Sequence, residues 1–167
     1  MKKITITITI AMLMSVFVAA PAVAADGKIT VGGNYGLDHS GVLGIMGEYD
    51  ISSMTQNQPV SIQAFLKRSS ESIPFSTVDA TSMGVAGIYD FNELARLDKK
   101  IHPYAGVGIR STKTKTTTTF IVTTSVSATS NSVYYVGGIR YFLTPALAGD
   151  LSLNEVGGIT AGVNYSF

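Results

Sequence analysis

Residues 158–167 read Gly-Ile-Thr-Ala-Gly-Val-Asn-Tyr-Ser-Phe, and this stretch decides the fold. Apolar side chains occupy every second position from Ile159 to Phe167, and the residues between them are polar or glycine. Such alternation is typical of a β-strand with one apolar and one polar face. The same pattern recurs over Ile29–Leu37 and Val133–Leu143, so we expect a chain built from strands.

Turn signals separate eight windows of this kind. They are Lys28–Leu37, Val42–Ile51, Val60–Arg68, Ser82–Phe91, Pro103–Ser111, Ser132–Leu143, Ala146–Asn154 and Gly158–Phe167. A transmembrane strand needs about 9–11 residues, so eight strands use roughly 80. An even number of strands leaves both chain ends on the periplasmic side. The sequence therefore predicts an all-β fold, an eight-stranded antiparallel up-and-down transmembrane β-barrel.

The first 24 residues differ from the rest of the chain. Lys2 and Lys3 precede an apolar stretch, Ile4–Ala20, and Ala22-Val23-Ala24 forms a small-residue cleavage site. This is the pattern of a secretory signal peptide, with an uncleaved membrane anchor as the alternative. We therefore expect a signal peptide over 1–24 and an outer-membrane barrel over 25–167. Cleavage of the signal peptide removes two of the 12 basic residues and none of the 11 acidic ones, so the net charge of the mature chain is 10 − 11 = −1. That balance argues against a nucleic-acid partner.

Composition narrows the class further. The chain is 46% hydrophobic and 14% charged, whereas soluble domains carry about 25% charged residues. This favours a surface that meets lipid over the alternative of a soluble β-sandwich. The chain has no cysteine and only two histidines, so we expect no disulfide, no metal site and no cofactor.

The C-terminal stretch resembles the assembly signal of outer-membrane barrels, which ends in an aromatic residue. Its pattern is matched by Thr160, Gly162, Tyr165 and Phe167. The segment His102–Gly108, His-Pro-Tyr-Ala-Gly-Val-Gly, resembles a strand common in small eight-stranded barrels. That family includes OmpX, the OmpA transmembrane domain and the opacity-type surface antigens. The resemblance implies the outer membrane of a Gram-negative bacterium, contact with its lipid and lipopolysaccharide, and the barrel assembly machinery as a partner.

This topology assigns each connection to one side of the membrane. The extracellular connections are Asp38–Gly41, Ser69–Thr81, Thr112–Asn131 and Glu155–Gly157, and the periplasmic ones are Ser52–Pro59, Asn92–His102 and Thr144–Pro145. Glu93–Leu97 could form a helical turn. Outward-facing aromatic residues then gather near the two interfaces, as barrel walls require. We expect Tyr49, Tyr89, Phe91, Tyr141, Tyr165 and Phe167 on the periplasmic side, and Tyr35 and Tyr135 on the extracellular side.

The opposite face of each strand is expected to line a polar lumen. Its members are Thr30, Asn34, Glu48, Asp50, Ser61, Gln63, Lys67, Ser82, Asp90, Tyr104, Arg110, Arg140, Asp150, Ser152, Thr160 and Asn164. Eight strands leave a lumen that side chains can fill, so charges there should be paired. We expect Glu48 and Asp150 to pair with Lys67, Arg110 or Arg140. A plugged lumen is favoured, and a narrow porin-like ion channel is the alternative.

Residues 112–131 form the most distinctive stretch, rich in threonine and poor in charge. We expect the flanking strands to continue outward as a hairpin that turns near Phe120–Thr124. Lys113 and Lys115 could blunt its edge or meet lipopolysaccharide phosphates. Phe120, Ile121 and Val122 favour a partner-binding edge, which would recruit an extracellular protein by strand addition. A polar loop that only shields the barrel mouth is the alternative.

Catalysis is not expected. Enzymatic barrels that modify lipid A need a histidine next to a nucleophile, and this sequence offers only His39 and His102. His39 lies in a predicted outer turn between Asp38 and Ser40, and His102 is interpreted as a turn residue. We therefore expect a non-enzymatic barrel with a structural or surface-interaction role, and a lipid A-modifying enzyme is the third alternative.

Overall fold

The computed structural model describes residues 28–37, 41–95, 97–119 and 122–167. The predicted signal peptide, 1–24, lies outside these residues. Eight strands of the described chain close into an antiparallel barrel in which each strand pairs with its neighbours in sequence. The ring closes between the first and last strands, where Thr30 is opposite Ser166 and Gly36 is opposite Thr160. The predicted fold class is confirmed.

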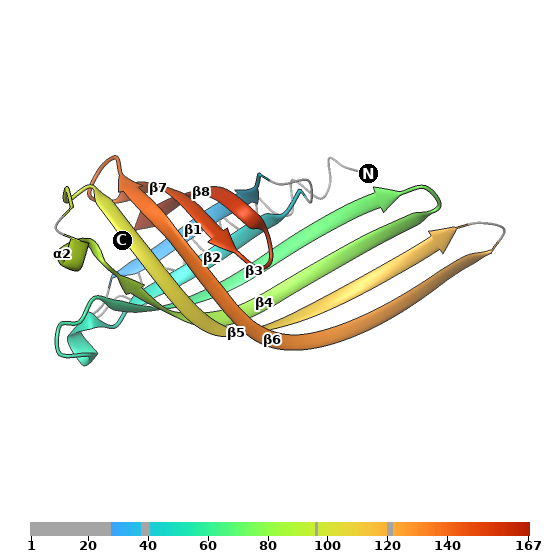
Figure 1. Cartoon of the computed structure of the whole chain (residues 1–167), viewed down its shortest axis with the longest axis horizontal. Coiled ribbons are helices and arrows are strands. Elements are labelled where there is room, and N and C mark those ends of the chain that lie inside the picture. Colours follow the sequence, from blue (N-terminus) through green and yellow to red (C-terminus); the bar gives the residue numbers. More distant parts are fainter. Residues whose placement is uncertain (1–27, 38–40, 96, 120–121) are drawn as a thin grey trace.

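The strands differ greatly in length. Four are short: β1 (Ile29–Gly36), β2 (Leu43–Asp50), β7 (Leu147–Asn154) and β8 (Gly158–Ser166). The four between them are long: β3 (Val60–Ile73), β4 (Ser76–Asp90), β5 (Ile101–Thr119) and β6 (Thr123–Phe142). The long strands leave the barrel together as a sheet that protrudes from one end (Figure 1). We call this sheet the protruding sheet, and it consists of residues 69–73, 76–81, 112–119 and 123–130.

The two ends of the barrel are distinct. At the end opposite the protruding sheet, Phe167 donates its backbone N–H to the carbonyl of Ile29. This end, the terminus end, also carries a short 3-10 helix (Ser52–Met54) and the single-turn helix α2 (Asn92–Ala95). The other end is called the hairpin end. Among the described residues, no helix is long and apolar enough to cross a membrane.

The predicted bounds of one connection are wrong. The sequence predicts a connection over Ser69–Thr81, but most of it is strand, because β3 and β4 pair continuously from Arg68↔Thr81 to Ile73↔Ser76. The turn contains only Pro74 and Phe75, and Phe75 adopts a positive φ of 65°. The serine-rich sequence lacks the apolar alternation of a barrel wall because the strands here leave the barrel. Sequence periodicity therefore fails where neither face is buried.

Smaller differences occur at the other connections. The threonine-rich hairpin extends outward as predicted, with Thr112↔Ser130 to Thr119↔Thr123 paired across it. The turn contains Val122, whereas Phe120 and Ile121 lie outside the described residues. The helical turn expected over Glu93–Leu97 begins earlier, at Asn92, because the backbone N–H of Asn92 donates to Asp90 Oδ1 at 2.8 Å.

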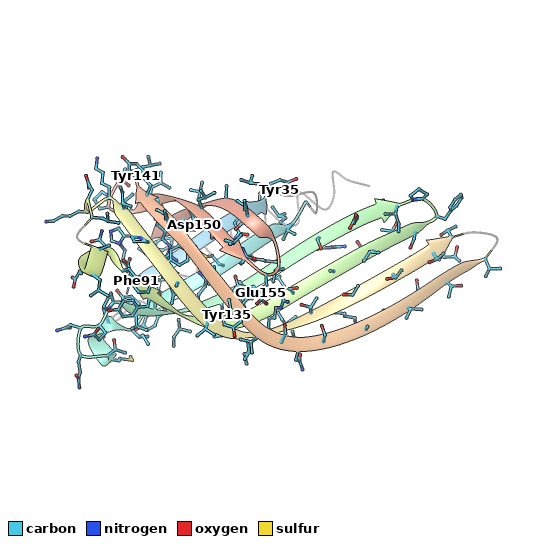
Figure 2. All side chains as sticks on the ribbon, in the orientation of Figure 1. Tyr35, Phe91, Tyr135, Tyr141, Asp150 and Glu155 are labelled. Atoms are coloured by element: carbon cyan, nitrogen blue, oxygen red, sulfur yellow. The ribbon has the colours of Figure 1, made fainter. Side chains whose placement is uncertain are left out.

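The predicted aromatic residues project from the barrel wall at two levels. Figure 2 shows Tyr141 and Phe91 at the terminus end, and Tyr35 and Tyr135 nearer the protruding sheet. Tyr35 and Tyr135 are the most exposed of these, at 53% and 55%. At the terminus end, Tyr165 and Phe167 pack with ring centroids 5.0 Å apart, as do Tyr89 and Phe91 at 4.9 Å. Tyr49, half-buried, lies at the same end.

Candidate functional site

The centre of the barrel lumen is an ion cluster built around Arg140. Its guanidinium donates twice to Glu48, from Nη1 to Oε1 at 2.9 Å and from Nη2 to Oε2 at 2.5 Å. Its Nε lies 3.4 Å from Asp150 Oδ2. Arg140, Glu48 and Asp150 come from β6, β2 and β7, and each is at most 9% exposed. The paired contact with Glu48 is the two-pronged geometry that makes arginine–carboxylate pairs strong.

Neutral donors hold the two carboxylates on their remaining sides. Ser61 and Gln63 of β3 donate to Glu48 at 2.7 and 3.3 Å. Tyr104 of β5 donates its hydroxyl to Asp150, 3.0 and 3.1 Å from the two oxygens. The Arg140 guanidinium also lies 4.4 Å from the centre of the Tyr104 ring. Buried charges that are fully hydrogen-bonded in this way are fixed in place, so the cluster ties opposite walls of the barrel together.

An apolar layer lies between this cluster and the hairpin end. Phe65 of β3 and Tyr134 of β6 meet across the lumen with ring centroids 4.3 Å apart. They belong to a buried core made of Met46, Phe65, Ala86, Ile88, Tyr104, Tyr134 and Val136, and the expected lumen set contained only Tyr104 of these. The expected lumen set is therefore incomplete: many of its polar members are buried, but it omits these apolar side chains. The alternation Ser61, Gln63, Phe65, Lys67 could have revealed Phe65, because it places that ring on the same face as the polar residues.

Two glycines leave space for the rings of Phe65 and Tyr104. A Cβ on Gly84 would lie 2.7 Å from Cζ of Phe65, and one on Gly138 would lie 2.8 Å from Cζ of Tyr104. Both distances are well inside van der Waals contact. Glycine is required at these inward positions because the lumen of eight strands is narrow.

Lys67 and Arg110 lie on the hairpin side of this layer, away from the acids of the cluster. Arg110 Nη2 is 3.5 Å from Glu155, and its Nε donates to Ser132 at 2.7 Å. Lys67 Nζ donates to Asn154 Oδ1 at 2.8 Å. Of the three cations expected to neutralise Glu48 and Asp150, only Arg140 contacts them among the described residues. Figure 2 shows Asp150 inside the barrel and Glu155 closer to the protruding sheet.

The terminus end of the lumen holds the pair Asp90 and His102. Nδ1 of His102 is 2.7 Å from Asp90 Oδ2, and Nε2 is 3.0 Å from the carbonyl oxygen of Lys99. The interpretation of His102 as a turn residue is wrong, because it lies within β5 and pairs with Arg140 of β6. The pair lines a cavity of about 310 Å³ at the terminus mouth. His39 lies outside the described residues.

The remaining candidate residues occupy two regions. Lys113 and Lys115 are exposed on β5 of the protruding sheet, and Val122 is 75% exposed. On β8, Thr160 is fully buried and contacts Ser152 Oγ at 2.7 Å, while Tyr165 and Phe167 face outward. A Cβ on Gly162 would lie 2.9 Å from Cβ of Asn34, so glycine allows β8 to close tightly against β1. Within the described chain, no group of three His, Asp or Glu could hold a metal ion.

These features define a small eight-stranded β-barrel whose lumen is crossed by an ion cluster and an aromatic layer. Residues 8–167 match the outer membrane protein β-barrel domain, and the chain belongs to this family of outer-membrane proteins. No curated protein sequence gives a match.

Solved structures of similar fold are small outer-membrane barrels. The N-terminal barrel domain of Pseudomonas aeruginosa OprF has a TM-score of 0.59 and 13% identity, over 85% of this chain and 100% of that one. Neisserial surface protein A has a TM-score of 0.54 and 17% identity, over 84% and 96%. Ail, the attachment invasion locus protein of Yersinia pestis, in complex with a heparin analogue, has a TM-score of 0.50 and 16% identity, over 85% and 99%. At these identities the likeness concerns the fold.

Proposed function

We propose that this protein is a non-enzymatic outer-membrane barrel that presents its protruding sheet to an extracellular partner. The barrel would anchor the sheet, and an extended segment of the partner would add to the edge of β6. The similarity to Ail, which is named for attachment and invasion, is in keeping with a role at the cell surface.

The observation that carries this proposal is the long unpaired edge of β6. β7 pairs with β6 only from Val136 to Phe142, so residues 123–135 have no neighbour on that side within the described chain. At about 3.3 Å per residue, this edge extends for roughly 40 Å. Its backbone N–H and C=O groups would be available to a new strand.

The composition of that edge supports the same conclusion. Proteins normally protect an exposed edge with charged residues or proline. Residues 123–135, Thr-Thr-Ser-Val-Ser-Ala-Thr-Ser-Asn-Ser-Val-Tyr-Tyr, contain neither. The opposite edge of the sheet, on β3, is shorter and carries Glu71. We therefore assign binding to the β6 edge and recognition mainly to backbone hydrogen bonds.

Synthetic peptides test the proposal directly. A fluorescent peptide with the uncharged sequence of residues 123–133 should raise its anisotropy on titration with the refolded mature protein. The same peptide with proline at the positions of Val126 and Ala128 should not bind, because proline cannot donate to a sheet. Val126→Lys with Ala128→Lys in the protein should abolish binding, whereas Thr77→Lys with Thr81→Lys on the central strand β4 should not. Equal binding of both peptides would contradict the proposal.

The lumen packing bears on the alternative of a channel. The rings of Phe65 and Tyr134 meet across the lumen, and the Arg140 cluster fills it below them. These contacts favour a plugged barrel. Planar-bilayer recordings should therefore show no discrete conductance steps, and reproducible steps that are lost in Arg140→Ala would establish the channel instead.

The arrangement at His102 bears on the enzymatic alternative. Its two ring nitrogens contact Asp90 and the Lys99 carbonyl, so neither faces a hydroxyl nucleophile. This supports a role without catalysis. Mass spectra of lipid A should be identical from cells with and without the protein.

A further inference from the structure

Among the described residues, the ammonium group of Lys67 is buried without an acidic partner. Lys67 is 3% exposed, and none of the ion pairs in the described chain includes it. Its one hydrogen-bond acceptor there, Asn154 Oδ1, also accepts the backbone N–H groups of Val156 and Gly157 at 3.1 and 2.9 Å. The Lys67 ammonium group, which has three N–H donors, thus shares one neutral acceptor oxygen with two backbone N–H groups. Buried charges in proteins are normally paired with an opposite charge.

The nearby aromatic layer separates Lys67 from the acids deeper in the lumen. Nζ lies 5.7 Å from the ring centre of Phe65 and 5.9 Å from that of Tyr134. Ring faces attract a cation weakly, and only a small part of its lost hydration is recovered in this way. Glu48 and Asp150 are already held by Arg140. Within the described chain, no acid of the lumen therefore makes a direct ion pair with Lys67.

A cavity of about 180 Å³ opens above Lys67 at the hairpin end. Its charged lining residues are Lys67, Arg68, Arg110 and Glu155, so positive charges exceed negative ones by 3 − 1 = 2. Lys67 and Arg110 come from β3 and β5, with β4 between them. Ser82, Thr112 and Ser130 add hydroxyl groups to the lining. The cavity combines surplus positive charge with several hydrogen-bond donors.

We propose that this cavity binds a tetrahedral oxyanion, a phosphate or sulfate group, free in solution or carried by a sugar. One oxygen would accept from Lys67 Nζ, and others from Arg110 and the lining hydroxyls. A water molecule takes about 30 Å³, so the cavity has room for such a group and several waters. Glu155 competes for Arg110 from the rim, where its side chain is 41% exposed. This site lies at the barrel mouth and is independent of strand addition at the β6 edge.

Titration of the refolded mature protein in nonionic detergent, at constant ionic strength set with chloride, tests the site. Inorganic phosphate, inorganic sulfate and glucose 1-phosphate are the probes, and calorimetry gives the affinity. The amide signals of Val156 and Gly157 report occupancy by NMR, because both donate to the oxygen that Lys67 contacts. Saturable binding with a shift of these two signals is expected. If the inorganic ions bind more tightly than glucose 1-phosphate, the site takes a free oxyanion. If glucose 1-phosphate binds more tightly, the site takes one carried by a sugar.

Substitutions give effects of opposite sign. Lys67→Met and Arg110→Gln should each weaken binding about tenfold or more, the size of one charged hydrogen bond. Glu155→Gln should strengthen it, because a competing carboxylate is removed. Lys99→Gln with Lys100→Gln removes two charges at the terminus end and should leave the affinity unchanged. Heat-modifiable gel mobility verifies that each variant is folded.

Three outcomes would overturn the proposal. The first is the absence of saturable binding for all three probes. The second is binding that the Lys99 and Lys100 control weakens as much as Arg110→Gln does, which would indicate nonspecific attraction. The third is unchanged affinity in folded Arg110→Gln. If Lys67→Met fails to fold, Arg110→Gln and Glu155→Gln still decide the question, because both residues are partly exposed at the rim.

Discussion

The protruding sheet continues four of the eight strands that enclose the lumen, yet the two regions differ in what holds their side chains. In β3, residues 61–67 alternate strictly between buried and exposed, whereas residues 70–73 are all exposed. Backbone pairing continues without a break across this change. The comparison shows that strand pairing extends beyond side-chain burial in this fold. Buried side chains pack inside the lumen, whereas the side chains of the protruding sheet are mostly exposed.

The largest effect is expected from breaking the lumen cluster. Arg140→Ala would leave Glu48 and Asp150 buried without a counter-charge, which typically costs about 3–5 kcal/mol. The free energy of unfolding, measured by urea titration of the refolded protein with gel mobility as readout, should fall by that amount. Arg110→Ala is the control, since its exposed ion pair contributes only about 0–1 kcal/mol. Similar losses in the two variants would contradict the assignment of the cluster as the centre of the lumen.

A smaller effect is expected from filling the space beside Phe65. In Gly84→Ala the new methyl would press on the Phe65 ring and on the carbonyl oxygen of Ile109. Overpacking of this kind costs about 1–3 kcal/mol. Gly87→Ala on the same strand is a matched control, because nothing lies within 4 Å of the new carbon. The same urea titration should separate the two variants, and equal stability would mean that the lumen is looser than described.

The smallest effect on stability is expected from shortening the protruding sheet. Replacing residues 114–128 by a two-residue Asn-Gly turn leaves Lys113 opposite Thr129, a pair already present in the hairpin. Because the removed residues contribute no buried side chain among those described, the urea midpoint should change less than in Gly84→Ala. The same variant should lose binding of the 123–133 peptide. A large loss of stability would show that the sheet supports the barrel.

The candidate site was only partly predictable from the sequence. Alternation placed Glu48, Lys67, Arg110, Arg140 and Asp150 on the inner face, and their inward-facing positions follow from period two alone. Their pairing did not follow, because Arg140 and Glu48 are separated by 92 residues and meet across the lumen. Which residues share one height depends on the strand register and on barrel closure. Neither the register nor the closure can be predicted from the residues of one strand.

The polar ends of β3 and β4 show a second limit. Ser69–Thr81 has the composition of a loop. It forms a hairpin because its two halves, the ends of β3 and β4, pair with each other and β4 also pairs with β5. The apolar alternation that predicts a strand arises from burial of one face, and these residues are not buried. Their strand conformation comes from pairing with neighbours.

The sequence by itself determined the class of fold, the number of strands and the inward position of the charged residues of the lumen. These features are local, because alternation and turn residues act within a few positions. Only the tertiary structure decided that Arg140 pairs with both Glu48 and Asp150 and that Lys67, among the residues described, pairs with neither. The reason is that charge pairing in a closed barrel is set by distances across the lumen, which depend on all eight strands together.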